Sequence, residues 1–84
     1  RQLFEHLGTL YERLGDRFDA YEQESIPLDR AFGKYLGRMR SRYDVENAPV
    51  WRKVVDYISG MTDLYALQCI RQITLPPPLR FPGV

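Results

Sequence analysis

The feature that most constrains the fold is a long stretch between Asn47 and three consecutive prolines at 76–78. Asn47 can cap a helix, and Pro49 suits a first helical turn because its missing amide hydrogen costs little there. Apolar residues then recur at helical spacing until the prolines end the pattern. The sequence therefore predicts one helix over about residues 48–73, ~35–40 Å long, followed by an extended tail.

Two shorter helices are expected earlier in the chain. Apolar residues recur at three- and four-residue steps from Leu3 to Leu14, and Gly15 supplies a typical helix end. Residues 16–28 fit an irregular connection or a short helical continuation. A second helix is expected to begin at about Asp29, as its N-cap, and to turn five side chains towards the core: Phe32, Tyr35, Leu36, Met39 and Tyr43.

Gly33 and Gly37 lie four residues apart in this second helix. Each lowers intrinsic helix stability by about 1 kcal/mol relative to alanine, and their spacing is typical of a close helix crossing. No alternating strand pattern persists beyond a few residues. We therefore predict an all-α fold, a small helical bundle of about three helices over residues 1–74, with a long C-terminal helix and an extended proline-rich tail over residues 75–84.

Composition argues against several classes of protein. The single cysteine, Cys69, excludes an internal disulfide and falls on the apolar side of its helix, where a small core residue is expected. No apolar run approaches the ~20 residues that cross a bilayer, so we expect no membrane insertion and a cytoplasmic location. The net charge of +1 is small for independent nucleic-acid binding.

The predicted long helix has two different faces. At about 100° per residue, apolar side chains fall on one side: Trp51, Val54, Ile58, Met61, Tyr65 and Cys69. Short polar residues gather on the opposite side: Asp56, Ser59, Gly60 and Asp63. Serine and glycine let another backbone or a ligand come close, whereas a face meant for water usually carries long charged side chains. We therefore predict that these four residues dock against another domain.

The same region carries a motif. Residues 56–67 run Asp-Tyr-Ile-Ser-Gly-Met-Thr-Asp-Leu-Tyr-Ala-Leu. This resembles the C-terminal, phosphohydrolase-associated signature of bacterial deoxyguanosine triphosphate triphosphohydrolase-like proteins (dGTPases) of the HD superfamily. The resemblance implies a parent hydrolase that splits a deoxynucleoside triphosphate (dNTP) into deoxynucleoside and inorganic triphosphate with a divalent metal, Mg²⁺ or Mn²⁺. It also implies an upstream HD catalytic domain in the same chain, assembly into homo-oligomers and, in some members, binding of single-stranded DNA.

The catalytic groups of that superfamily are not expected in this chain. The superfamily is named for a His-Asp doublet, whereas the one histidine here, His6, is followed by Leu7. One imidazole cannot assemble a catalytic metal centre, so we predict no catalytic and no metal-binding residue. The chain starts with Arg1 inside a predicted helix and without an initiator methionine, which leads us to expect preceding sequence. Its own predicted role is to scaffold the active-site bundle of the parent enzyme.

A run of basic residues supplies a second candidate site. Four of them recur every four residues on the second predicted helix: Arg30, Lys34, Arg38 and Arg42. One hypothesis is that this stripe contacts phosphate or another anion. The other is a solvated face whose charges pair with nearby acids.

The polar face of the long helix admits three interpretations. Asp56 could pair with Arg52 one turn earlier and leave a plain surface. It could, with its neighbours, dock against the catalytic bundle. It could also contact the sugar or base of a substrate, away from phosphates that would repel a carboxylate. A function of another class is a free-standing helical interaction module that uses the basic stripe and the proline-rich tail as partner surfaces.

Overall fold

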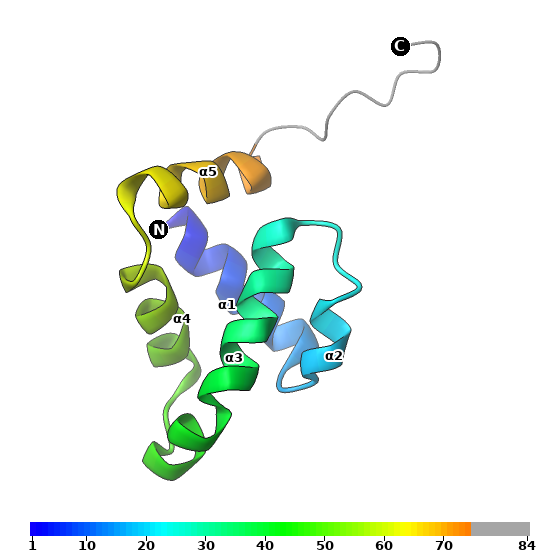
Figure 1. The fold of residues 1–84 in the computed structure, drawn as a ribbon, viewed down its shortest axis with the longest axis vertical. Coiled ribbons are helices and arrows are strands. Elements are labelled where there is room, and N and C mark those ends of the chain that lie inside the picture. The colour runs from blue at the N-terminus through cyan, green and yellow to red at the C-terminus, as the bar shows by residue number, and fades with distance from the viewer. Residues whose placement is uncertain (75–84) are drawn as a thin grey trace.

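The computed structural model describes residues 1–74 and places them in five helices without a strand in that range (Figure 1). The helices are α1 (Gln2–Leu14), α2 (Phe18–Tyr21), α3 (Pro27–Glu46), α4 (Val50–Ser59) and α5 (Asp63–Thr74). The all-α class is therefore confirmed, whereas the expected number of about three helices is wrong. The predicted extended tail, residues 75–84, lies outside the described residues.

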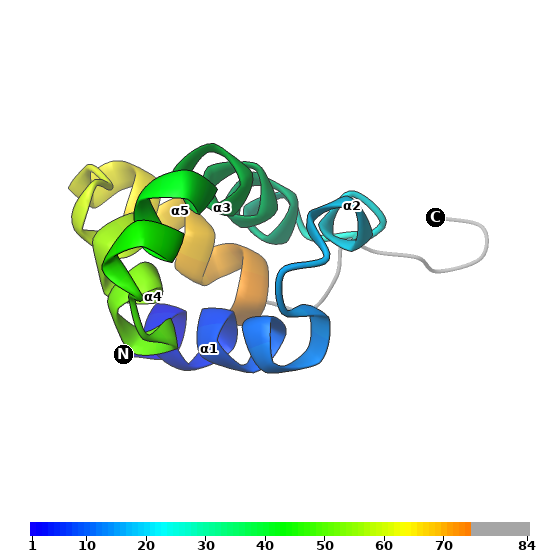
Figure 2. The same ribbon diagram turned by 90° about the horizontal axis from the view of Figure 1, so that it is seen from below.

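The helices pack around α1 and α3. The chain descends along α3, returns along α4, and then crosses one end of the molecule as α5 (Figure 1). Figure 2 shows that α5 reaches from α3 to α1, and both helices contact it. The short helix α2 packs on α3, on the side away from α4. Over residues 1–74, no helix is long and apolar enough to cross a membrane.

Helix α1 forms as its leucine pattern predicts. Leu3, Leu7, Leu10 and Leu14 are all buried, because three- and four-residue steps place them on one side of the helix. Gly15 ends the helix with a φ of 58°, a left-handed conformation that glycine adopts at little cost. Its amide donates a hydrogen bond to the carbonyl of Tyr11 at 2.6 Å. The predicted end of this helix is therefore confirmed.

Helix α3 begins and ends at different signals from those predicted. It begins at Pro27, because the residue before a proline prefers an extended conformation and Ile26 adopts one as N-cap. Asp29 is therefore not the N-cap but a buried residue of the first turn. Asn47 ends α3 in a left-handed conformation with a φ of 52°, so its predicted role as N-cap of the following helix is wrong. Asparagine tolerates this conformation better than most residues.

The single helix predicted over residues 48–73 is also wrong, because the chain breaks between α4 and α5. Helix α4 ends at Ser59, with Gly60 as its C-cap. Thr62 then starts α5: its Oγ1 accepts the amide hydrogen of Tyr65 at 3.1 Å, and its carbonyl accepts that of Ala66 at 2.9 Å. Thr62 is thus a start signal for α5, whereas Gly60 keeps a right-handed conformation that does not require glycine.

The core is formed mainly by α1, α2 and α3. Phe32 and Tyr43 are buried as predicted, and Tyr21 of α2 packs edge-on against Phe32. Gly33 confirms the predicted close crossing, because a Cβ at this position would overlap with the Cβ and Cγ of Tyr21. Gly37 is exposed, and a Cβ added there would have the Phe18 ring at 4.0 Å as its nearest neighbour.

The apolar side predicted for residues 51–69 is only partly in the core. Val54 and Cys69 are 1% and 0% exposed, as predicted, and Ile58 and Met61 are partly buried. Trp51 is 60% exposed and Tyr65 is 37% exposed, contrary to the prediction. The break after Ser59 gives α5 a new direction, so the two helices no longer share one continuous face.

Candidate functional site

The signature residues meet α3 at the corner between α4 and α5. A hollow of about 360 Å³ lies there, and we call it the corner hollow. Two of its lining residues come from α3 and the others from the 56–67 motif: Tyr35, Arg38, Asp56, Tyr57, Gly60, Met61, Thr62 and Tyr65. The motif therefore builds one wall of a site and does not form a straight polar stripe.

Tyrosine rings form much of this site. Tyr57 is partly buried, with its ring centroid 4.8 Å from that of Tyr35 and 5.2 Å from that of Phe32. Burial raises the pKa of the Tyr57 hydroxyl, so this group stays neutral at physiological pH. The nearby guanidinium of Arg38 acts on the same pKa in the opposite direction.

The carboxylate of Asp56 is held from inside the domain. The Tyr43 hydroxyl donates a hydrogen bond to Asp56 Oδ2 at 3.1 Å, and Arg52 Nε lies 3.5 Å from the same oxygen. The Tyr35 and Tyr43 hydroxyls are 2.6 Å apart, and because Tyr43 donates its one proton to Asp56, Tyr35 is the donor to Tyr43. Burial and these hydrogen bonds raise the pKa of Tyr43. The Asp56–Arg52 pair, which was one of three interpretations of this residue, is present, and Asp56 in addition ties α4 to α3.

The four predicted docking residues do not share one helix face. Asp56 and Ser59 belong to α4, Gly60 caps it, and Asp63 opens α5. Ser59, Gly60 and Asp63 are exposed. A Cβ at Gly60 would meet only the carbonyls of Tyr57 and Asp56, at 3.7 and 3.9 Å, which is ordinary contact. Within this domain, nothing in the local packing requires a glycine at position 60.

The four residues of the predicted basic stripe differ in whether they have a partner within the domain. Arg30 donates to the carbonyl of Glu24 at 2.8 Å, and Arg42 pairs with Glu46 at 3.2 Å. Lys34 and Arg38 are exposed and form no ion pair with any described residue. Of these four residues, Arg38 is the one that lines the corner hollow.

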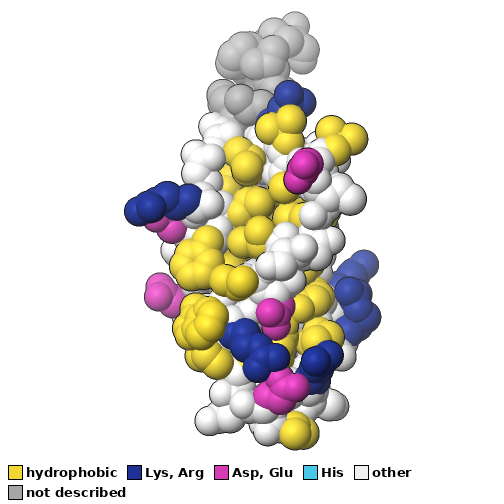
Figure 3. All heavy atoms as spheres, turned by 90° about the vertical axis from the view of Figure 1, so that its left-hand side faces the viewer, with side chains coloured by type: hydrophobic (Ala, Val, Ile, Leu, Met, Phe, Trp, Pro, Cys, Tyr) yellow, Lys and Arg dark blue, Asp and Glu magenta, His cyan; other side chains and the backbone are white. Residues whose placement is uncertain are grey.

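Apolar side chains lie exposed on α4 and α5, where sequence reasoning expected either core or polar positions. Figure 3 shows hydrophobic side chains gathered over these two helices, with basic and acidic side chains at the edges and in the lower part of this area. We call this surface the α4–α5 face and define it by its large exposed members: Val50, Trp51, Val55, Leu64, Tyr65 and Leu67. Tyr65 also lines the corner hollow, so the face and the hollow are continuous.

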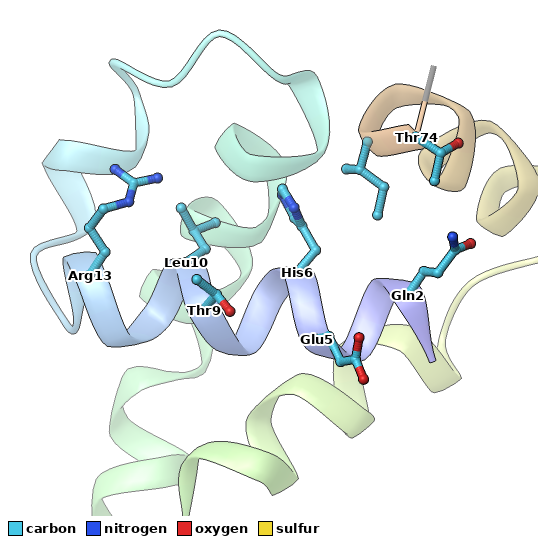
Figure 4. Close-up of a pocket in the computed structure, with 8 residues that line it drawn as sticks. Gln2, Glu5, His6, Thr9, Leu10, Arg13 and Thr74 are labelled. Carbon is cyan, nitrogen blue, oxygen red and sulfur yellow. The ribbon is translucent and has the colours of Figure 1, made fainter. Parts of the chain in front are cut away.

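A second hollow of about 400 Å³ lies between α1 and the end of α5. In Figure 4, His6, Leu10 and Arg13 rise from the same side of α1. His6 Nε2 is 2.7 Å from Oδ1 of Asp29, which is 2% exposed. Sequence reasoning missed this pair because it assigned Asp29 to a helix cap. Among residues 1–74, no cluster of three or more His, Cys, Asp or Glu side chains could hold a metal ion.

Comparison with known proteins identifies the family. Residues 1–72 match the family model of the phosphohydrolase-associated domain, as the resemblance of the 56–67 motif predicted. Neither the curated proteins nor the solved structures contain a match to this chain. The family match covers all but the last two residues of the part that the structure describes. The chain therefore belongs to the phosphohydrolase-associated domain family.

Proposed function

We propose that this domain docks through the α4–α5 face onto the HD catalytic domain of a dNTP triphosphohydrolase, with dGTP as the expected substrate. Family membership associates the domain with HD phosphohydrolases, and the 56–67 motif resembles the dGTPase-like members. In this proposal the catalytic domain holds Mg²⁺ or Mn²⁺. The present domain supports the helices that carry the metal ligands and completes the wall of the active-site bundle.

The observation that carries the proposal is the exposure of large apolar side chains on α4 and α5. Trp51 is 60% exposed, Leu64 is 65% exposed and Leu67 is 45% exposed. Scattered single apolar residues are normal on a protein surface, but an apolar surface that adjoins a hollow and has a charged border is typical of an interaction site. Tryptophan is also among the residues that contribute most to binding energy at interfaces.

The polar residues at the corner have a supporting role in this proposal. Ser59, Gly60 and Asp63 are exposed at the turn, where short side chains allow a partner backbone to approach closely. Asp56 is already held by Tyr43 and Arg52, so we assign it to positioning α4 and α3. Ser59, Gly60 and Asp63, together with the apolar face, therefore remain our proposed docking set, and Asp56 supports them from inside the domain.

The experiment uses the parent enzyme and replaces one exposed apolar residue at a time. We expect Trp51→Ser and Leu64→Ser to lower the rate of triphosphate release from dGTP, because both remove apolar area from the contact. Val45→Ser is the matched control, since Val45 is 86% exposed on α3 and lies outside the α4–α5 face. Unchanged activity in both face variants, with folding intact, would contradict the proposal.

The alternative function, a free-standing module that binds anions through the basic stripe, has less support. Only Lys34 and Arg38 of the four predicted anion contacts lack an acidic or carbonyl partner among the described residues. The expected homo-oligomer and single-stranded DNA partner stay predictions. Sedimentation analysis tests the first, and titration with a labelled oligodeoxynucleotide at two salt concentrations tests the second.

A further inference from the structure

Arg38 has no counterion among residues 1–74, like Lys34 on α3 and Arg71 on α5, but of these three cations it is the one that lines the corner hollow. Arg52 is tied to Glu46 and Asp56, and Arg42 is tied to Glu46. Arg38 has no carboxylate within 4 Å among residues 1–74. Asp56 lines the same hollow, but its carboxylate faces Tyr43 and Arg52.

Arg38 lies where a partner bound to the α4–α5 face would cover it. Arg38 lines the corner hollow together with Tyr57 and Tyr65, and Tyr65 also belongs to the α4–α5 face. A partner that covers the face must therefore cover or border the hollow and displace water from the guanidinium. An arginine that loses water without gaining an anion costs several kcal/mol, whereas a carboxylate placed against its planar fork offsets that cost.

We propose that the corner hollow receives an acidic side chain, Asp or Glu, of the HD catalytic domain, and that Arg38 is its counterion. This inference rests on the proposed docking through the α4–α5 face and names the chemistry of the partner at one point of it. The tyrosine walls restrict water around the pair and so strengthen it. Gly60 and Thr62 also line the hollow, and both are exposed and short.

Charge complementarity distinguishes this occupant from others. A basic partner side chain would be repelled by Arg38, and a purely apolar one would leave the guanidinium buried without a partner. A free phosphate would satisfy Arg38 without any protein contact. It therefore forms a separate arm of the test, with inorganic triphosphate as the probe.

The test measures the dissociation constant between this domain and its separately expressed HD catalytic domain by isothermal titration calorimetry. We expect Arg38→Gln to weaken binding by about 30-fold or more, because it leaves a buried carboxylate unpaired. Arg38→Lys should recover part of this loss, since it keeps the charge but not the fork. Lys34→Gln is the matched control, an exposed cation without an ion pair that does not line the hollow, and should change binding less than twofold.

The outcomes separate this inference from the docking proposal. If Trp51→Ser weakens binding while Arg38→Gln does not, docking stands and the acidic partner is refuted. If neither variant weakens binding, both are refuted. Saturable binding of inorganic triphosphate to the domain alone, lost in Arg38→Gln, would also overturn the inference in favour of a phosphate site. Circular dichroism spectra of each variant check that the helices are retained.

Discussion

The close crossing of α2 and α3 makes Gly33 the position where one methyl group should do most damage. A Cβ at Gly33 would overlap with the Cβ and Cγ of Tyr21. The Tyr21 side chain cannot swing away, because it is 0% exposed and its hydroxyl donates to the carbonyl of Gly15 at 2.6 Å. The methyl group must therefore push the two helices apart.

The expected magnitude for Gly33→Ala follows from two opposing effects. Overpacking against the rigid base of a side chain costs ~3 kcal/mol, at the upper end of the usual range. Alanine returns about 1 kcal/mol through its better helix propensity. The net loss in free energy of unfolding is ~2 kcal/mol, or a fall in the melting temperature of about 8–16 °C for a domain of this size.

Gly37→Ala is the matched control on the same helix. Position 37 is exposed, and the added methyl group would have the Phe18 ring at 4.0 Å as its nearest neighbour. We expect this variant to be more stable by about 0.5–1 kcal/mol. Thermal unfolding followed by circular dichroism at 222 nm measures both variants. A Gly33→Ala variant as stable as the Gly37→Ala variant would refute the close crossing.

Three further predictions concern the break, the tyrosines and the cysteine. Thr62→Ala should lower the free energy of unfolding by about 1 kcal/mol, because it removes the N-cap of α5; chemical denaturation with urea measures this, and an unchanged midpoint would argue against the cap. Burial raises the pKa values of Tyr11, Tyr21, Tyr43 and Tyr57, so these tyrosines bind protons more tightly in the folded state. Their contribution to stability should therefore be constant below about pH 10 and fall above it. Absorbance at 295 nm against pH, recorded with helicity, would contradict this if all tyrosines ionised near pH 10 with the helices intact. Burial also raises the pKa of the Cys69 thiol, so a thiol reagent should label Cys69 at the rate of unfolding, and immediate labelling of the native domain would show that the residue is accessible.

Local signals were sufficient where a single helix ends at an unambiguous residue. The leucine period of α1 and the glycine after it predicted both the buried side and the end of the helix. The inward positions of Phe32 and Tyr43 on α3 followed from spacing in the same way. These features depend on residues close in sequence, so they can be predicted without knowledge of the tertiary structure.

The break between α4 and α5 was missed although its signals are local. Apolar residues keep helical spacing across it, from Val54 to Cys69, because both helices turn one side to the same core. That continuity conceals the C-cap Gly60 and the N-cap Thr62. Asn47 was misassigned for a related reason, since asparagine is favoured both before a helix and, in left-handed conformation, after one.

The candidate site depends on tertiary structure and was only partly predictable. The motif at 56–67 identified the region and the family, and the family match confirms it. The meeting of Arg38 with Tyr57 and Tyr65 requires α3 to lie beside the corner, which no spacing in the sequence specifies. Trp51 is 60% exposed, although spacing alone placed this residue in the core.

Hydroxyl-radical footprinting with and without the HD catalytic domain tests docking through the α4–α5 face most directly. It reports the solvent accessibility of single side chains, and Trp51, the one tryptophan of the chain, is both reactive and 60% exposed. We expect oxidation of Trp51 and Tyr65 to fall several-fold in the complex, while that of Phe18 on α2 does not change. Complex formation that leaves Trp51 as reactive as in the isolated domain would contradict it.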